Sequence, residues 1–135
     1  VKSNHGHKVI RTTFENGVTS RSGSYAAWMG FYALEVSTIQ QQVTVPSDKP
    51  YLAYWHWIVS ADQCLRDKAT VLVNNSDVDS YLLCADTQTH GWAKHVVNLA
   101  AYAGQTVTLT LHVKNDGNKN SNLYVDDVGF QANAG

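Results

Sequence analysis

The chain has 135 residues, of which 44% are apolar and 16% are charged, and its net charge is −1. This length predicts a single domain whose core is large enough to fold without a metal ion. The sequence has no basic block or stripe, which argues against nucleic acid as a partner, because binding a polyanion depends on clustered Lys and Arg. No apolar run reaches the roughly 20 residues of a membrane-spanning helix.

Apolar and polar residues alternate along most of the chain, and this period of two predicts strands rather than helices. The alternation is cleanest at 106–114, where Val and Leu alternate with Thr and His. Eight strands are predicted in chain order, at residues 8–14, 36–45, 51–60, 69–74, 78–84, 92–98, 106–114 and 122–130. Residues 98–104 form at most one helical turn, since this stretch is short and ends in Gly.

The spacing of these strands predicts an all-β fold, an antiparallel β-sandwich of the jelly-roll type with about eight to nine strands and little or no helix. Residues 1–13 form an N-terminal arm or a first strand, and residues 14–135 form one β-sandwich domain. The arm pairs either within its own sheet or, by strand addition, with the sheet of a neighbouring molecule.

The last predicted strand contains a slip of one residue. Leu123 and Val125 alternate, and so do Val128 and Phe130, but the two pairs are out of phase across Asp126-Asp127. A β-bulge at this point would re-aim one side chain and interrupt the ladder. The two adjacent carboxylates would repel each other unless a cation or an Arg neutralises them.

The chain contains two cysteines, Cys64 and Cys84, each near the end of a predicted strand. A disulfide between them would close a 20-residue loop and contribute about 3 kcal/mol, and it would indicate an oxidising compartment. The alternative is a pair of buried thiols in a cytosolic protein.

Seven motifs follow one another along nearly the whole chain. They are FENG (14–17), RSGSYAAWMG (21–30), QQVTVP (41–46), LAYWHWIVS (52–60), CLRDKATVLV (64–73), GWAKHVVNLAAYAGQTV (91–107) and SNLYVDDVGF (121–130). This series resembles the galactose-binding-like jelly rolls, which include many carbohydrate-binding modules and the C-terminal accessory domains of secreted hydrolases and surface proteins. The resemblance implies a fold, and it does not specify a ligand.

The resemblance also implies a structural calcium ion, held by an acidic residue near the N-terminus and an Asp of the last strand. The matching residues here are Glu15 with Asp126 or Asp127, and backbone carbonyls near Ser24 would complete the shell. Calcium takes six to eight oxygen ligands, both carboxylate and carbonyl. The alternative is a hydrogen-bonding role for Asp126, with Asp127 in solvent.

Both faces of the predicted strand 51–60 are apolar, so one face is covered or binds something. Tyr51, Trp55 and Trp57 share one face, and they are the candidate ligand-binding residues, because two Trp rings at i and i+2 form a platform on which sugars stack. The alternative is that Trp55 and Trp57 fill the core of the sandwich.

No catalytic signature accompanies these features. The sequence contains no G-x-S-x-G, H-E-x-x-H or phosphate-binding Gly-rich loop, and its histidines match no structural zinc spacing. A glycosidase needs two carboxyl groups across a cleft, whereas Asp126 and Asp127 are sequence neighbours whose side chains diverge on a regular strand. We therefore expect a non-enzyme.

Two functions are consistent with the sequence. The first is a non-catalytic extracellular binding module for a polysaccharide or a glycoprotein glycan. The second is a structural or adhesive subunit of a surface protein or extracellular filament, whose partners are copies of itself or a larger surface protein. An exposed Trp55 and Trp57 would favour the first function, and an arm at 1–13 paired with a neighbour would favour the second.

Overall fold

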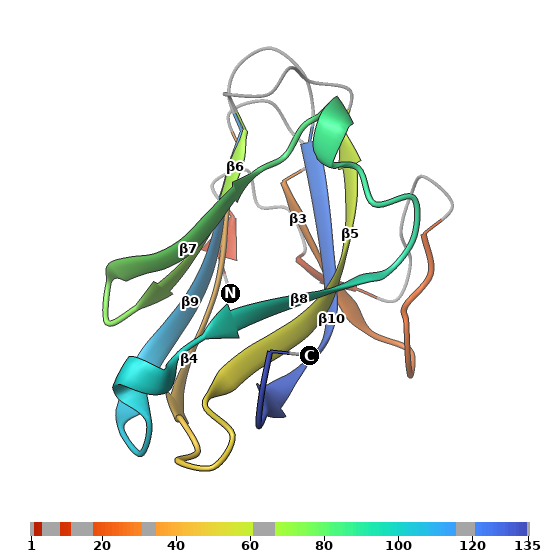
Figure 1. Ribbon diagram of the computed structural model, residues 1–135. Helices are drawn as coiled ribbons and strands as arrows, with labels where there is room; N and C mark the ends of the chain where they lie inside the picture. Colours follow the sequence, from red (N-terminus) through yellow and green to blue (C-terminus); the bar gives the residue numbers. More distant parts are fainter. Residues whose placement is uncertain are drawn as a thin grey trace.

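A computed structural model of the protein describes residues 2–3, 9–11, 18–30, 35–60, 67–115 and 121–134. These residues form two five-stranded antiparallel sheets that pack face to face, which confirms the predicted all-β sandwich (Figure 1). Within the described ranges there are ten strands, two of which are only two residues long. No helical turn in this part of the chain is long or apolar enough to cross a membrane.

The first sheet has the strand order β1-β4-β9-β6-β7. Its strands are β1 (Lys2–Ser3), β4 (Val36–Thr44), β9 (Thr106–Lys114), β6 (Lys68–Val73) and β7 (Ser76–Leu82). The second sheet has the order β2-β3-β10-β5-β8. Its strands are β2 (Ile10–Arg11), β3 (Ala26–Gly30), β10 (Ser121–Gln131), β5 (Tyr51–Ser60) and β8 (Ala93–Asn98).

The two helical elements are single 3-10 turns, η1 (Ala85–Thr87) and η2 (Ala100–Tyr102). The second confirms the single turn predicted within 98–104. A tight turn at Asn74-Asn75 joins β6 to β7, and both residues have positive φ, of 50° and 68°. Asn tolerates this left-handed backbone better than most residues, and two such residues are typical of a hairpin turn that matches the twist of its strands.

The main core lies between the sheets and follows the predicted alternation. From β9, Val107 and Val113 are buried in it, and Leu109 and Leu111 pack against it. Strand β3 was not among the predicted strands. All five of its residues are buried, so it lacks the polar side chains that would make the period visible, as expected where both faces of a strand are covered.

Part of the N-terminal arm belongs to the domain itself. Lys2–Ser3 pairs with β4, and Ile10–Arg11 pairs with β3. Val9 is 2% exposed within the main core, and its carbonyl accepts a hydrogen bond of 2.7 Å from the backbone N–H of Trp28. These described residues therefore complete their own sheets. The rest of residues 1–13 lies outside the described ranges, and strand exchange with a neighbour stays a prediction.

Candidate functional site

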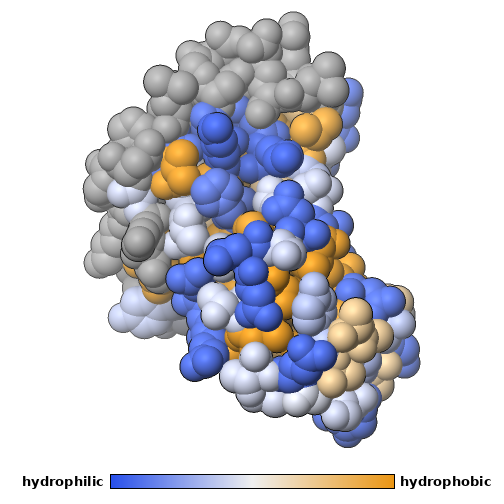
Figure 2. All heavy atoms as spheres, turned by 90° about the vertical axis from the view of Figure 1, so that its left-hand side faces the viewer, coloured by the Kyte–Doolittle hydropathy of each residue, from blue (hydrophilic) through white to orange (hydrophobic). Residues whose placement is uncertain are grey.

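A groove of about 870 Å³ lies on the outer face of the first sheet. Figure 2 shows the side of the molecule that carries this sheet, where hydrophilic side chains predominate and smaller hydrophobic areas lie between them. The groove is lined by Thr38, Gln40, Lys68, Thr70, Leu72, Asn75, Asp77, Leu82, Thr110, His112, Lys114 and Asn115. Nearly all of these side chains carry a hydrogen-bonding group.

Because side chains alternate between the two faces of a strand, these residues all lie on the outer face of the first sheet. Residues that alternate with the buried Val and Leu of β9 point away from the core, and the ladders to β4, β6 and β7 align them with their neighbours. Three cross-strand rows result: Leu82, Lys68 and Lys114 in the first; Thr70, His112 and Thr38 in the second; Asp77, Leu72, Thr110 and Gln40 in the third. The first and third rows are four residues apart along β9, or roughly 13 Å.

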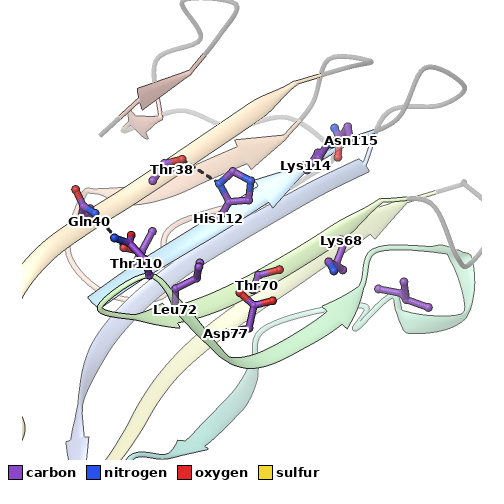
Figure 3. Close-up of a pocket in the computed structure, with 12 residues that line it drawn as sticks. Thr38, Gln40, Lys68, Thr70, Leu72, Asp77, Thr110, His112, Lys114 and Asn115 are labelled. Atoms are coloured by element: carbon purple, nitrogen blue, oxygen red, sulfur yellow. Dashed lines mark hydrogen bonds between the residues drawn. The ribbon is translucent and has the colours of Figure 1, made fainter. Parts of the chain in front are cut away.

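Two hydrogen bonds orient side chains within the groove (Figure 3). The Thr38 hydroxyl lies 3.2 Å from Nδ1 of His112, and Gln40 Nε2 donates to the Thr110 hydroxyl at 3.2 Å. Imidazole and amide groups each have a second polar atom, so His112 and Gln40 are held in place while they retain a group for a ligand. Such fixed donors and acceptors suit hydroxyl-rich molecules.

The charge of the groove is positive near His112. Partial burial, together with the charges of Lys114 and Lys68, lowers the pKa of His112 below its ordinary value, against an opposite effect of Asp77. The imidazole is therefore neutral at pH 7, and it offers one donor and one acceptor rather than two donors.

The predicted aromatic platform lies on the outer face of the second sheet. Val18, Trp28 and Tyr124 form a small second core there, against which Trp57 and Trp92 pack. Trp28 is 2% exposed, and its ring stacks on Tyr124 with centroids 5.6 Å apart. Trp57 meets Trp92 edge to face at 5.8 Å. This second core explains why both faces of β5 are apolar.

Trp55 and Tyr51 are half-buried on the same face of β5. The guanidinium of Arg21 lies 3.8 Å from the centroid of the Trp55 ring, which is a cation–π geometry. One face of this ring is thus covered by the protein's own side chain. Sugar stacking on Tyr51, Trp55 and Trp57 stays a prediction.

The slip at Asp126-Asp127 is a β-bulge, as predicted. Asp126 pairs with Trp55 and Gly129 with Ala53, so β10 holds one residue more than β5 between these pairs. Asp127 adopts positive φ, 52°. The bulge breaks the alternation and directs both carboxylates to segment 18–25, which covers the outer face of the second sheet.

The two carboxylates hold this segment in place. Asp126 accepts hydrogen bonds from the backbone N–H groups of Arg21 (2.9 Å), Ser22 (3.1 Å) and Asp127 (2.8 Å). Asp127 accepts from the Arg21 guanidinium at 2.7 Å and from the Ser22 hydroxyl. The bonds from Ser22 and Arg21 lower the pKa of Asp127. Arg21 is therefore a neutralising cation for the adjacent carboxylates.

Calcium binding by Glu15, Ser24, Asp126 and Asp127 stays a prediction. Glu15 lies outside the described residues, and among those that are described no group of three His, Cys, Asp or Glu side chains is placed to hold a metal ion. The melting temperature in chelator and in added calcium is the measurement that tests it, because an ion bound only by the folded chain raises stability by mass action.

Replacing Asp126 with alanine should lower the free energy of unfolding by about 1.5–3 kcal/mol, since three N–H groups lose a charged acceptor. Asp127→Asn is the matched control, because Asn tolerates the positive φ of this position. It removes an ion pair at the surface, which is worth less than about 1 kcal/mol. Urea unfolding measures the free energy of unfolding of both variants, and we expect the larger loss for Asp126→Ala. An equal loss of stability in the two variants would contradict the assigned role of Asp126.

The predicted disulfide falls partly outside the described residues. Cys84 is buried after β7 and takes part in a disulfide, whereas Cys64 lies within 61–66. The pairing of Cys64 with Cys84 stays a prediction, and a thiol titration of the denatured, unreduced protein tests it.

A cluster of polar rings links the sheets where β7 and β8 form neighbouring edges. Tyr54 and Tyr81 share a hydrogen bond of 2.7 Å between hydroxyls, and the Tyr81 hydroxyl lies 3.2 Å from Nδ1 of His56. His95 Nε2 lies 2.6 Å from a carboxylate oxygen of Asp79. Burial, reinforced by His95, lowers the pKa of His56 to about 4. Burial also raises the pKa of both tyrosines.

The groove was not predicted from the sequence, although one signal for it was present. Thr106, Thr108, Thr110 and His112 form the polar side of the most regular strand. Three of the four are β-branched hydroxyl residues, which an ordinary exposed strand also carries. Only the cross-strand neighbours distinguish a binding groove from a solvated face.

Comparisons with protein families and with curated proteins found no match. Solved structures with a similar fold exist. The carbohydrate-binding module TmCBM61, in complex with β-1,4-galactotriose, matches with a TM-score of 0.53 and 14% identity over 84% of this chain and 74% of that chain. SGBP-B, from a complex xyloglucan utilization locus in Bacteroides uniformis, matches with a TM-score of 0.50 and 12% identity over 81% of this chain.

A third structure, solved with a xylogluco-oligosaccharide, matches with a TM-score of 0.56 and 11% identity over 93% of this chain. The present chain spans 40% of the SGBP-B chain and 35% of this third one. These identities establish a shared architecture. The chain therefore has a β-sandwich fold similar to that of these three structures.

Proposed function

We propose that this chain is a non-catalytic, extracellular glycan-binding module, and that the groove on the outer face of the first sheet holds the glycan. The observation that carries the proposal is the three-row arrangement of hydroxyl, amide and imidazole groups on rigid strands. Leu72 and Leu82 add apolar surface for the C–H faces of sugar rings. The fold shared with oligosaccharide complexes supports the same ligand class.

The charged groups of the groove support binding rather than hydrolysis. Among the described lining residues Asp77 is the single carboxylate, whereas the common glycosidase mechanism uses two carboxyl groups on opposite sides of the scissile bond. An extracellular location is consistent with this function, since polysaccharides and glycoprotein glycans are displayed outside cells, and with a disulfide at Cys84.

The test is affinity electrophoresis against β-1,4-galactan, xyloglucan, arabinoxylan and polygalacturonate, followed by calorimetry on any glycan that retards the protein. Gln40→Ala and His112→Ala should each weaken binding by about fivefold, since one lost hydrogen bond is worth about 1 kcal/mol and 1.4 kcal/mol is tenfold. Gln42→Ala is the matched control, because Gln42 lies two residues along β4 and outside the groove.

Clearly weaker retardation of Gln40→Ala than of the wild type and Gln42→Ala would support the groove. Equal binding by all three proteins would refute it. Trp55→Ala and Trp57→Ala belong in the same series, since a loss of binding confined to these two folded variants would place the glycan on the aromatic face of the second sheet instead.

A structural or adhesive role remains the alternative. It requires residues 1–13 to pair with a neighbouring molecule, whereas the described parts of this segment pair with β4 and β3 of their own chain. Sedimentation analysis at rising concentration separates the two roles, and we expect a monomer.

A further inference from the structure

The end of the groove that is farther from Gln40 is basic (Figure 3). Lys68 and Lys114 are direct partners across the β6–β9 ladder, and both side chains are exposed. Directly opposed like charges destabilise an antiparallel pair. Yet within the described ranges neither ammonium group forms an ion pair with a carboxylate.

The neighbouring side chains do not remove this positive charge. His112 and Thr70 form the next row, and the only carboxylate of the described lining, Asp77, lies one row farther along. The whole chain carries a net charge of −1. Among the described lining residues the positive charge is therefore concentrated at this end of the groove, and it does not reflect a basic protein.

We propose that this basic end binds the anionic group of an acidic glycan, the carboxylate of a uronic acid or the sulfate of a sulfated sugar. The proposal rests on the glycan-binding function proposed above and specifies its ligand class. Lys68 and Lys114 supply the two charges, and the imidazole of His112 supplies a neutral hydrogen bond to the same sugar, with Thr70 at the floor of the groove. The third row, with Thr110 and Gln40, binds the neutral hydroxyls of the next sugars.

No carboxylate of the described lining lies beside the two lysines, and an anionic ligand would supply that negative charge. An anion between the two ammonium groups replaces their repulsion with two attractions, and this difference appears only on binding. Since both lysines are exposed, salt screens these attractions, and affinity should fall as ionic strength rises.

The experiment compares glycans that differ in charge alone. Polygalacturonate is set against its fully methyl-esterified form, and a sulfated galactan against neutral β-1,4-galactan, for the wild type, Lys68→Gln, Lys114→Gln and Lys49→Gln. Lys49 is exposed in a turn after β4 and outside the groove, so its variant makes the same change in net charge.

We expect the wild type and Lys49→Gln to prefer at least one charged glycan over its neutral partner. Each groove lysine variant should lose about tenfold in affinity for that charged glycan, in line with one hydrogen bond to a charged group, and keep its affinity for the neutral one. The pair of glycans for which this preference appears shows whether the anionic group bound is a carboxylate or a sulfate. The melting temperatures of the free lysine variants should equal or exceed that of the wild type, because the repulsion is gone.

Equal affinity for charged and neutral forms, or a preference that survives in both groove variants, would overturn the acidic ligand while leaving the glycan-binding module intact. An equal loss of affinity in Lys49→Gln would show that the effect comes from the net charge of the protein. This result would also overturn the proposal. Failure of all four glycans to bind would overturn both proposals. A lower melting temperature in both groove variants would show that the lysines stabilise the fold instead.

Discussion

Trp28→Ala is expected to lower the free energy of unfolding by about 3–5 kcal/mol, the usual cost of removing a buried large aromatic side chain. The ring is buried between Tyr124, on which it stacks, and Arg11, whose guanidinium lies 4.6 Å from its centroid. Its Nε1 also donates to Asn122 at 2.8 Å. A domain of this size has a total stability of about 5–15 kcal/mol, so the loss is a large fraction of it.

Urea unfolding followed by circular dichroism measures this loss, and Trp92→Ala is the matched control. Trp92 packs at the margin of the same cluster and is half-buried, so its replacement should cost less. A similar cost for the two variants would contradict a second core centred on Trp28, and it would return the outer face of the second sheet to consideration as a binding platform.

The protein should also lose stability in mild acid because of His56. This side chain is 7% exposed, and its pKa is about 4 in the folded protein, against 6.5 for the free side chain. Between these values the unfolded chain binds a proton that the folded chain does not. Stability from neutral His56 is therefore complete above pH 6.5 and is lost as the pH falls toward 4, by about 1.4 kcal/mol per pH unit and about 3 kcal/mol in all.

Unfolding by urea at pH 7, 5.5 and 4.5 tests this dependence in the wild type and in His56→Gln, which keeps a polar group beside Tyr81 but does not titrate. The groups that face His56 are Tyr54, Tyr81, His95 and Asp79, and all of them remain in the variant. The lowered pKa of Asp127 acts mainly below this window. Parallel curves for the two proteins would show that His56 does not cause the acid sensitivity.

His112 is the second histidine with a lowered pKa, and it makes a useful comparison. It lies on the outer face of the first sheet and is less buried than His56. His112→Gln should therefore change the pH dependence less than His56→Gln does.

The long strands of the first sheet were predictable because that sheet packs on the core with one face and is open on the other. In β9 the alternation is complete, and its predicted bounds, 106–114, are those observed. The bulge was also predictable, since a slip in the pattern can only be accommodated by an extra residue. Strand β3 was not predictable in this way, because both of its faces are covered and its five residues show no period.

The candidate site could be predicted much less well, because its parts are far apart in the sequence. Lys68 and Lys114 become partners through the β6–β9 ladder, and local patterning does not contain that register. Arg21 and Asp127 are 106 positions apart. The two apolar faces of β5 were correctly predicted, but the sequence could not tell a second core from an open platform, because that depends on where segment 18–25 lies.

The central claim is that the glycan binds in the groove of the first sheet, and amide chemical shifts test it most directly. The ¹⁵N-labelled protein is titrated with an oligosaccharide of the glycan that retards it in electrophoresis. The groove predicts that the largest shifts fall on Thr38, Thr70, Thr110 and His112. Shifts concentrated on Trp55, Trp57 and Trp92, with the first sheet unchanged, would contradict it.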